Sequence, residues 1–308
     1  MKIATAAYPL SFFATWQDYE DKITHWVEQA VAEGAVLLVF PEYGAMELAS
    51  LAGEAAAGDV IGSVTAVADH LAKAARLHRQ LAMAHGVHIL MASGPARTDP
   101  ARLDPAQAAG AMVNRAYLLA PSGAVTFQDK QIMTRFERDD WNIAGGEGLR
   151  VFETALGRIG VLICYDSEFP LLGRALAEAG VEILLVPSCT EALEGYWRVR
   201  IGAMARALES QCVAVMASIV GVEPRLFAVE ENCGAGGIFG PPDRGFPPTG
   251  VLAEGALNQP GWTYAEVDLE QVRTVRADGH VLNRSHWPEQ VARLAVESVE
   301  MRASAPST

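Results

Sequence analysis

Residues 160–170 read Gly-Val-Leu-Ile-Cys-Tyr-Asp-Ser-Glu-Phe-Pro, and this stretch decides how the chain is interpreted. An apolar, strand-like run stops at Cys164, and the pattern of residues 171–176 predicts a helix. A sharp strand-to-helix turn projects a side chain beyond the sheet edge, where the next backbone N–H groups point at the same space. A helix N-terminus also favours a thiolate over a thiol. Cys164 is therefore either a nucleophile or a buried structural cysteine.

Two further stretches bear on this choice. Residues 36–44 read Val-Leu-Leu-Val-Phe-Pro-Glu-Tyr-Gly, so that Glu42 directly follows a buried, parallel-type strand. Residues 127–141 read Phe-Gln-Asp-Lys-Gln-Ile-Met-Thr-Arg-Phe-Glu-Arg-Asp-Asp-Trp, with Lys130 after a strand and Glu137 in an expected loop. Each of these three residues alone fits a solvated surface charge, but the order Glu, Lys, Glu, Cys, each at the end of a strand or in the loop after it, is a specific pattern.

These three motifs resemble the nitrilase superfamily of carbon–nitrogen hydrolases. The resemblance runs from about residue 1 to about residue 290, and the stretches 198–209 and 240–248 are similar to a soluble, uncharacterised, amidase-like branch. Members of that branch are sometimes fused to an acetyltransferase domain, for which we expect no room here. The motifs that carry the resemblance are Phe40-Pro41-Glu42, Lys130 with Glu137 and Trp141, and Cys164-Tyr165-Asp166 with Phe169-Pro170.

The resemblance implies an α/β fold, a four-layer α-β-β-α sandwich in which two sheets pack face to face and helices cover the outside. We expect one domain over residues 1–290 and a C-terminal tail over residues 291–308. Segment 271–300 continues past the last expected strand, and such tails in this superfamily often reach across a dimer interface. The expected partner is therefore a second copy of the chain, in a homodimer or a higher homo-oligomer.

The resemblance also assigns the chemistry of amide hydrolysis. Cys164 is the expected nucleophile and forms a thioester acyl-enzyme. Glu42 accepts its proton, gives it to the leaving ammonia and then activates the deacylating water. Lys130 and the backbone N–H of Tyr165 hold the oxyanion. Glu137 is expected to orient the nucleophile side and the substrate nitrogen. No metal and no cofactor is expected.

Residues near these motifs are candidates for lining the substrate pocket. Arg135 or Arg138 fits either a substrate carboxylate or an ion pair with Asp139 or Asp140. Glu168 is expected to cap the helix that starts at Phe169, or else to line the pocket. The remaining candidates are Tyr165, Cys189, which is also an alternative nucleophile, and Thr190; Asp166 is expected to be structural and bonded to nearby backbone.

The leading interpretation is an amidase for a small aliphatic amide. An N-carbamoyl hydrolase or a nitrilase would use the same residues, although Cys-Tyr-Asp resembles amidase branches more than the Cys-Trp-Glu of nitrile-cleaving ones. A non-catalytic regulatory or binding protein on this fold is the alternative of another class. An acyltransferase is a third, but the acyl-transferring relatives that modify lipoproteins are embedded in membranes.

Composition limits the partners. The net charge of −13 argues against nucleic acid and anionic membranes, which bind basic patches. No apolar run reaches the roughly 20 residues that cross a bilayer, and a cytoplasmic location is the default expectation. The four cysteines form no C-x-x-C pair and no cluster with histidine, so we expect neither a zinc site nor disulfides, and Cys212 and Cys233 are expected to be structural.

Apolar periodicity predicts alternating strands and helices, which argues for an α/β fold. On the helix over 195–211, Trp197, Ile201, Met204, Ala205 and Leu208 are expected to face the core. Residues 99–110 are expected to be a surface excursion, and residues 302–308 a frayed end. The expected strands are 2–8, 36–40, 88–93, 115–120, 124–128, 158–164, 183–187, 212–218, 237–239 and 263–268, and the expected helices are 17–33, 61–84, 171–179 and 195–211.

Overall fold

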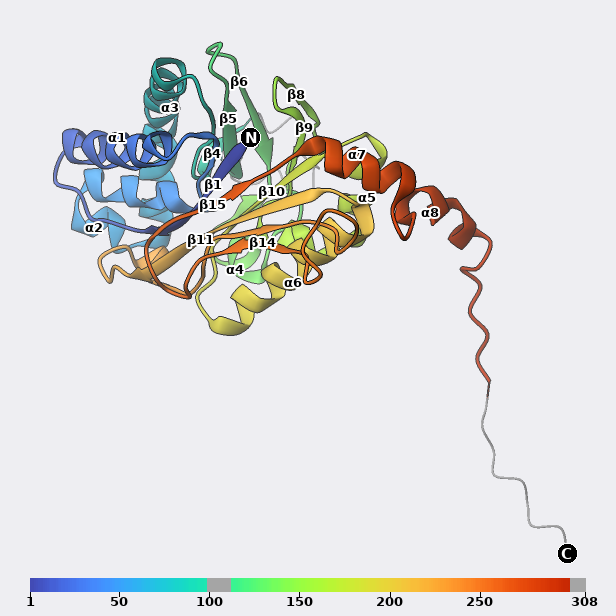
Figure 1. Cartoon of the computed structure of the whole chain (residues 1–308). Coiled ribbons are helices and arrows are strands. Elements are labelled where there is room, and N and C mark those ends of the chain that lie inside the picture. Colours follow the sequence, from blue (N-terminus) through green and yellow to red (C-terminus); the bar gives the residue numbers. More distant parts are fainter. Residues whose placement is uncertain (99–111, 300–308) are drawn as a thin grey trace, which may run out of the picture.

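Parallel strands run through the centre of the molecule (Figure 1). The computed structural model describes residues 1–98 and 112–299. Neighbouring parallel pairs follow the order β3-β2-β1-β11-β10-β9, and antiparallel strands extend the path at both ends. The strands on this path are β4 (Gly94–Arg97), β5 (Met112–Leu119), β3 (His88–Leu90), β2 (Ala35–Val39), β1 (Lys2–Pro9), β11 (Val213–Val222), β10 (Ile183–Ser188), β9 (Gly157–Val161) and β8 (Phe152–Thr154).

Shorter strands complete the sheet, and helices lie outside it. The other strands are β6 (Val125–Asp129), β7 (Ile143–Ala144), β12 (Glu231–Asn232), β13 (Gly237–Phe239), β14 (Val251–Glu254) and β15 (Gly261–Glu266). The α-helices are α1 (Trp16–Ala32), α2 (Glu54–Ala57), α3 (Val60–His85), α4 (Arg135–Asp139), α5 (Pro170–Glu178), α6 (Leu193–Ser210), α7 (Leu269–Asp278) and α8 (Asn283–Val291). The 3₁₀ helices are η1 (Gly44–Ala52), η3 (Cys164–Glu168) and η4 (Phe227–Val229).

Two buried clusters define the layers of the fold. Alternate residues of β1 belong to different clusters, because successive side chains of a strand point to opposite faces. Ala4 packs in the cluster that joins β1–β3 to α1 and α3. Ile3 packs in the cluster that joins these strands to β9–β11 and to α5 and α6. Helices therefore cover both outer faces (Figure 1), and the expected four-layer sandwich is confirmed.

Local signals place the two long N-terminal helices close to where the sequence predicts them. Thr15 and Asp18 form a capping box at the start of α1. Asp59 caps α3 through the Gly62 N–H, and Gly86 ends that helix in the left-handed conformation that glycine adopts readily. The observed bounds differ from the predicted ones by one residue at each end.

The orientation of α6 differs from the prediction. Trp197, Ile201 and Leu208 are exposed, and the buried face of the helix instead includes Val199 and Ala203. Apolar residues occupy two faces of this helix, so periodicity alone does not reveal which face the protein's own core covers. The prediction that the Trp197 face is core was therefore wrong.

Two strands near the site, β9 and β3, end three residues earlier than predicted. β9 ends at Val161 instead of Cys164, because the chain turns after the Leu162 N–H has bonded the Leu185 carbonyl (2.9 Å). β3 ends at Leu90 instead of Ser93, and the Ser93 N–H bonds the carbonyl of Pro41, the residue before Glu42 (3.1 Å).

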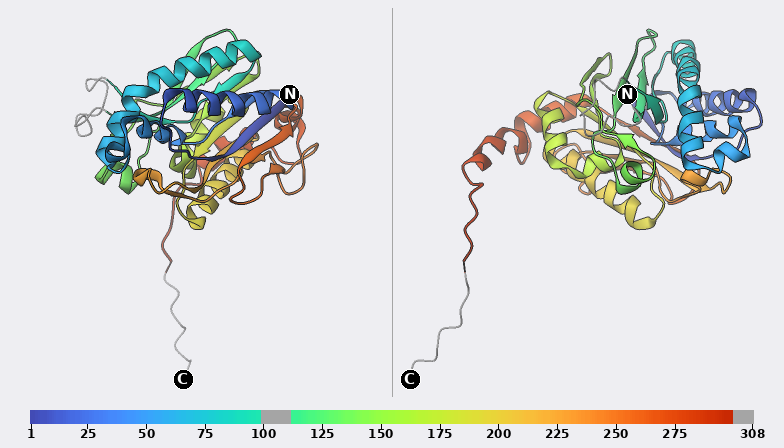
Figure 2. Two further views of the ribbon diagram at one scale, coloured as in Figure 1. Left: turned by 90° about the vertical axis from the view of Figure 1, so that its left-hand side faces the viewer. Right: turned by 180° about the vertical axis from the view of Figure 1, so that it is seen from behind.

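The C-terminal segment leaves the body of the molecule. α8 has no buried residue, and residues 292–299 extend away from the sandwich (Figure 2). No helix within residues 1–98 and 112–299 is long and apolar enough to cross a membrane. The predictions for residues 99–110 and 302–308 lie outside the described residues, and the division at residue 290 stays a prediction.

Candidate active site

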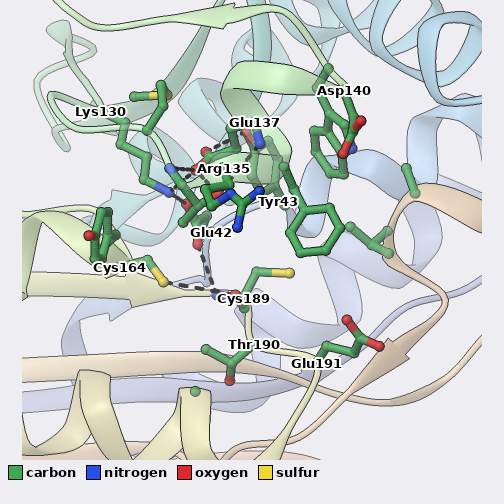
Figure 3. A pocket seen from close by; sticks show the side chains of 18 of the residues that line it. Glu42, Tyr43, Lys130, Arg135, Glu137, Asp140, Cys164, Cys189, Thr190 and Glu191 are labelled. Carbon is green, nitrogen blue, oxygen red and sulfur yellow. Dashed lines mark hydrogen bonds and ion pairs between the residues drawn. The ribbon is translucent and has the colours of Figure 1, made fainter.

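The sequence-predicted residues converge on one cavity at the ends of the strands (Figure 3). Glu42 follows β2, Lys130 follows β6, and Cys164 begins η3 after β9. The Lys130 Nζ atom lies 2.7 Å from Glu42 Oε1 and 2.6 Å from Glu137 Oε2. Glu42, Lys130, Glu137 and Cys164 all line the same cavity, which has a volume of about 1240 Å³.

Cys164 occupies a sharp turn. Its φ of 49° lies in the left-handed region, which is costly for a residue with a Cβ atom and is typical of functional turns. The Ser167 hydroxyl donates to the Cys164 carbonyl (2.6 Å), and the Cys164 Sγ atom lies 3.8 Å from the Cys189 carbonyl oxygen. The predicted strand–turn–helix geometry is confirmed, with a 3₁₀ helix inserted before α5.

Glu42 is buried and is held by donors on both carboxylate oxygens. Oε1 accepts from Lys130 Nζ and from Asn114 Nδ2 (3.0 Å), and Oε2 accepts from the Cys189 N–H (3.0 Å). Burial raises the pKa of Glu42 to about 7, because the nearby Lys130 opposes this effect only in part and Glu137 adds to it. A carboxylate with a pKa near neutrality can both accept and return a proton.

The thiol of Cys164 is not the preformed thiolate that the sequence suggests. Burial raises its pKa well above the ordinary value, the charge of Glu42 raises it further, and Lys130 opposes both effects. A helix N-terminus stabilises an exposed anion, whereas this sulfur is buried beside a carboxylate. Any attack by this sulfur would therefore require transfer of its proton to a neighbouring base.

Glu137 lies in the short helix α4 and not in the expected loop. It forms a capping box with Thr134, whose N–H (2.9 Å) and hydroxyl (2.8 Å) both donate to Glu137 Oε2. The Tyr43 hydroxyl donates to Oε1 (2.8 Å). Burial opposes ionisation of Glu137, but Lys130, Thr134 and Tyr43 outweigh it and lower its pKa. Glu137 is thus an ionised counter-charge for Lys130.

Lys130 remains a cation. Burial alone would lower its pKa, but the charges of Glu137 and Glu42 outweigh burial and raise the pKa well above the ordinary value. A fully buried ammonium group beside two carboxylates is therefore a fixed positive charge in the cavity wall.

Asp166 braces the nucleophile turn against the lysine loop. Its carboxylate accepts from the backbone N–H groups of Gln131, Ile132 (2.8 Å) and Ile163 (3.3 Å). The structural role expected for Asp166 is confirmed. It links the turn that carries Cys164 to the loop that carries Lys130.

The candidate substrate-binding residues all line the cavity: they are Tyr165, Glu168, Cys189, Thr190 and Arg135. Arg135 points outward with its side chain 96% exposed and lies 3.9 Å from Asp139, which matches the surface ion pair among the two alternatives. The capping role expected for Glu168 is wrong. α5 has no side-chain cap, and Glu168 instead pairs with Arg198 across the cavity wall (3.1 Å).

The other three cysteines are less well placed than Cys164 to act as a nucleophile in the cavity. The Cys189 Sγ atom contacts Asn232 Oδ1 (3.3 Å), and its backbone N–H serves Glu42. Cys212 is buried in the core, where burial raises its pKa to about 11. The backbone of Cys233 bonds Thr190 through both its N–H and its carbonyl. In the part of the chain that the structure describes, no cluster of His, Cys, Asp and Glu has the geometry of a metal site.

Sequence reasoning missed several residues of the site. Tyr43 directly follows Glu42 and has a φ of 53°, which turns its hydroxyl toward Glu137. Asn114 lies in β5, one position before the predicted strand, so it was not recognised as a buried polar residue. Phe136 and Phe227 form part of the cavity wall at its exposed side, and nothing local marks Phe227 as a pocket residue.

Comparisons with known proteins agree with this geometry. Residues 2–277 match the family model of carbon-nitrogen hydrolases. The chain is 30% identical over 281 residues to the probable hydrolase YhcX of Bacillus subtilis, covering 91% of this chain and 52% of that protein. It is 34% identical over 125 residues to the human deaminated glutathione amidase, covering 40% of this chain and 35% of that enzyme. The chain thus spans about half of the first relative and about a third of the second.

Solved structures show the same fold. An acrylamide-modified mutant of the amidase from Nesterenkonia sp. AN1 superposes with a TM-score of 0.66 at 21% identity, over 90% of this chain and 97% of that chain. Nit3 of Saccharomyces cerevisiae, a member of branch 10 of the nitrilase superfamily, superposes with a TM-score of 0.67 at 18% identity, over 90% and 93% of the two chains.

Proposed function

The chain belongs to the carbon–nitrogen hydrolase family of the nitrilase superfamily, and we propose that it is a thiol-dependent amidase that releases ammonia from a small aliphatic amide. The observation that carries the proposal is that Cys164 and Glu42 line one cavity, where the charge of Glu42 raises the pKa of the thiol and burial raises the pKa of Glu42 itself to about 7. Glu42 therefore combines proximity to the thiol with a proton affinity suited to general base catalysis.

Acylation begins when Glu42 takes the proton of Cys164 and the sulfur attacks the amide carbonyl carbon. The negative charge that develops on the carbonyl oxygen is held by Lys130 Nζ and by the backbone N–H of Tyr165, the residue after the nucleophile. Glu42 then gives its proton to the departing nitrogen, the carbon–nitrogen bond breaks, and ammonia leaves behind a thioester on Cys164.

Deacylation reuses the same carboxylate. Glu42 accepts a proton from a water molecule, and the resulting hydroxide attacks the thioester carbonyl. The carbon–sulfur bond breaks, the sulfur regains its proton from Glu42, and the product is a carboxylic acid. The two half-reactions together consume one water and restore both residues.

We assign Glu137 a role that differs from the one the resemblance implies. Both of its oxygens accept from the protein: Oε2 from Lys130 and Thr134, and Oε1 from Tyr43. This geometry supports a role in fixing Lys130 more than one in binding the substrate nitrogen. Glu137 then acts on the reaction through the position and charge of the lysine.

An N-carbamoyl compound or a nitrile would use the same catalytic residues as an amide. The substrate class and its acyl group must therefore be identified by experiment. The test measures ammonia release from small amides, ω-amides of dicarboxylic acids, N-carbamoyl amino acids and nitriles. We expect wild-type protein to release ammonia from an amide and Cys164→Ala to release none.

The matched control is Cys212→Ala, which removes a buried thiol outside the cavity and should retain turnover. Equal ammonia release by wild type and Cys164→Ala would refute the proposal. Release from nitriles or N-carbamoyl compounds alone would replace the amidase assignment with one of the alternatives. The cytoplasmic location stays a prediction.

A further inference from the structure

Asn114 is a neutral side chain that hydrogen-bonds both carboxylates of the site. It lies in β5 and is fully buried. Its Nδ2 atom is 3.0 Å from Glu42 Oε1 and 3.5 Å from Glu137 Oε1. Its backbone carbonyl accepts from the Lys130 N–H (2.9 Å). One residue of β5 therefore contacts all three charged residues.

The other end of the same amide shows that this orientation has a cost. Asn114 Oδ1 is buried and has no hydrogen-bond partner among the described residues. A buried acceptor without a donor is unfavourable. The reverse orientation would point a carbonyl oxygen at two carboxylates, which is repulsive, so the hydrogen-bond network assigns the amino group to the carboxylate side. The site thus keeps an unsatisfied oxygen in order to supply two donors.

The charge of the site explains why a neutral donor matters there. Glu42 and Glu137 together carry up to two negative charges around the single positive charge of Lys130. A donor between them stabilises both carboxylates without adding another charge. Lys130 bonds the same oxygen of Glu42 that Asn114 bonds, so the amide also fixes how that carboxylate is rotated.

We propose that Asn114 is a positioning residue that fixes Glu42 and Glu137 about Lys130 and thereby sets the pH range over which Cys164 becomes reactive. The inference rests on the proposed function, because that function makes Glu42 the base for Cys164. Asn114 acts through the two glutamates, since its own side chain is fully buried behind them.

Titratable or charged groups approach Glu42 from several elements. They are Tyr43 before η1, Lys130 after β6, Glu137 in α4, Cys164 in η3, and Cys189 after β10. Substituting Asn114 by an uncharged residue leaves all of these groups in place. A shift in the pH dependence would therefore report the lost amide donors and not a lost charge.

The test measures the rate at which iodoacetamide labels Cys164, by peptide mapping of the full chain from mildly acidic to mildly alkaline pH. Asn114→Leu has nearly the shape of asparagine and removes both donors. We expect the midpoint of the labelling rate to move to higher pH by about one unit, because Glu42 holds its proton more tightly without this donor. Asn114→Ser has a shorter side chain and should shift the pH midpoint in the same direction. This variant replaces Asn114→Leu if the leucine variant does not fold.

The matched control is Thr5→Val, which removes a buried hydrogen bond outside the site, from Thr5 Oγ1 to the Met216 carbonyl (2.7 Å). The Thr5→Val variant should show the same pH midpoint of Cys164 labelling as wild type. A wild-type midpoint in a folded Asn114 variant would overturn the inference. Labelling needs no substrate, so a shifted midpoint in a protein that releases no ammonia would support the role of Asn114 and refute the amidase proposal.

Discussion

Glu42 and Glu137 bind the same ammonium group, yet their proton affinities move in opposite directions. Burial dominates at Glu42 and raises its pKa to about 7. Lys130, Thr134 and Tyr43 outweigh burial at Glu137 and lower its pKa. Two titratable groups whose environments separate their proton affinities are the usual sign of distinct acid–base roles. This difference supports the proposed roles, in which Glu42 transfers the proton and Glu137 gives electrostatic support.

Replacing Glu42 with glutamine should remove the base and leave the fold intact. We expect turnover to fall by at least about 10²-fold, the usual contribution of general acid–base catalysis. In wild type, kcat/KM should rise with pH through about 7 as Glu42 ionises. Ammonia release measured across pH checks both expectations, with Glu153→Gln on an exposed ion pair as control. Normal turnover by Glu42→Gln would exclude Glu42 as the base.

At this scale the sequence identifies the charged residues but not their environment. Glu42, Lys130 and Cys164 were found because each lies at or shortly after the end of a strand, in a motif that resembles a known family. Their burial depends on side chains distant in the chain, so the raised pKa of the Cys164 thiol was not predicted. The sequence did not identify Asn114 and Tyr43 as site residues for the same reason, since their importance comes from contacts with Glu137.

Among the elements, α3 shows how a well-predicted helix carries an unpredicted property. Its buried face includes His78, whose Nδ1 atom bonds the Ala74 carbonyl (2.9 Å). Nε2 has no hydrogen-bond partner among the described residues. Burial lowers the pKa of His78 from 6.5 to about 4, so the folded protein holds this imidazole neutral. The unfolded chain takes up the proton first as the pH falls.

His78 should therefore make folding sensitive to acid. Its contribution is fully present above pH 6.5 and is lost as the pH falls toward about 4. Between pH 7 and pH 5 we expect wild type to lose about 2 kcal/mol more unfolding free energy than His78→Leu. Urea unfolding at both pH values measures this difference. His70→Leu, on the same helix with the same type of backbone contact, is the control for a half-buried histidine, and equal pH sensitivity of wild type and His78→Leu would refute the account.

Most of the long elements were predictable from the sequence, and most of the short ones were not. Helix α1 carries a capping signal and a continuous apolar face, which fix its position from local sequence. The strands β4, β7, β8, β12 and β14, with two to four residues each, are defined by their pairing partners. Helix α4 has only five residues, and it exists where the Glu137 side chain caps it while binding Lys130.

The whole molecule exposes an apolar surface on α6. Leu193, Trp197 and Ile201 follow one another at intervals of four residues and lie on one exposed face of this helix. Regularly spaced exposed apolar residues are typical of a surface that a partner covers. The homodimer expected from the sequence stays a prediction, and this face is where we expect the second copy.

Light scattering of wild type should give twice the chain mass of 32.9 kDa, and Ile201→Glu should lower the measured mass. A monomeric mass for wild type would refute the expected dimer.

We propose that Cys164, activated by Glu42, is the nucleophile of this hydrolase. Peptide mapping after limiting iodoacetamide treatment of wild type and Glu42→Gln tests both residues at once. We expect Cys164 to be labelled ahead of Cys189, Cys212 and Cys233 in wild type, and the substitution to slow labelling at Cys164 alone. Labelling of Cys189 first, or an unchanged rate at Cys164 in Glu42→Gln, would contradict it.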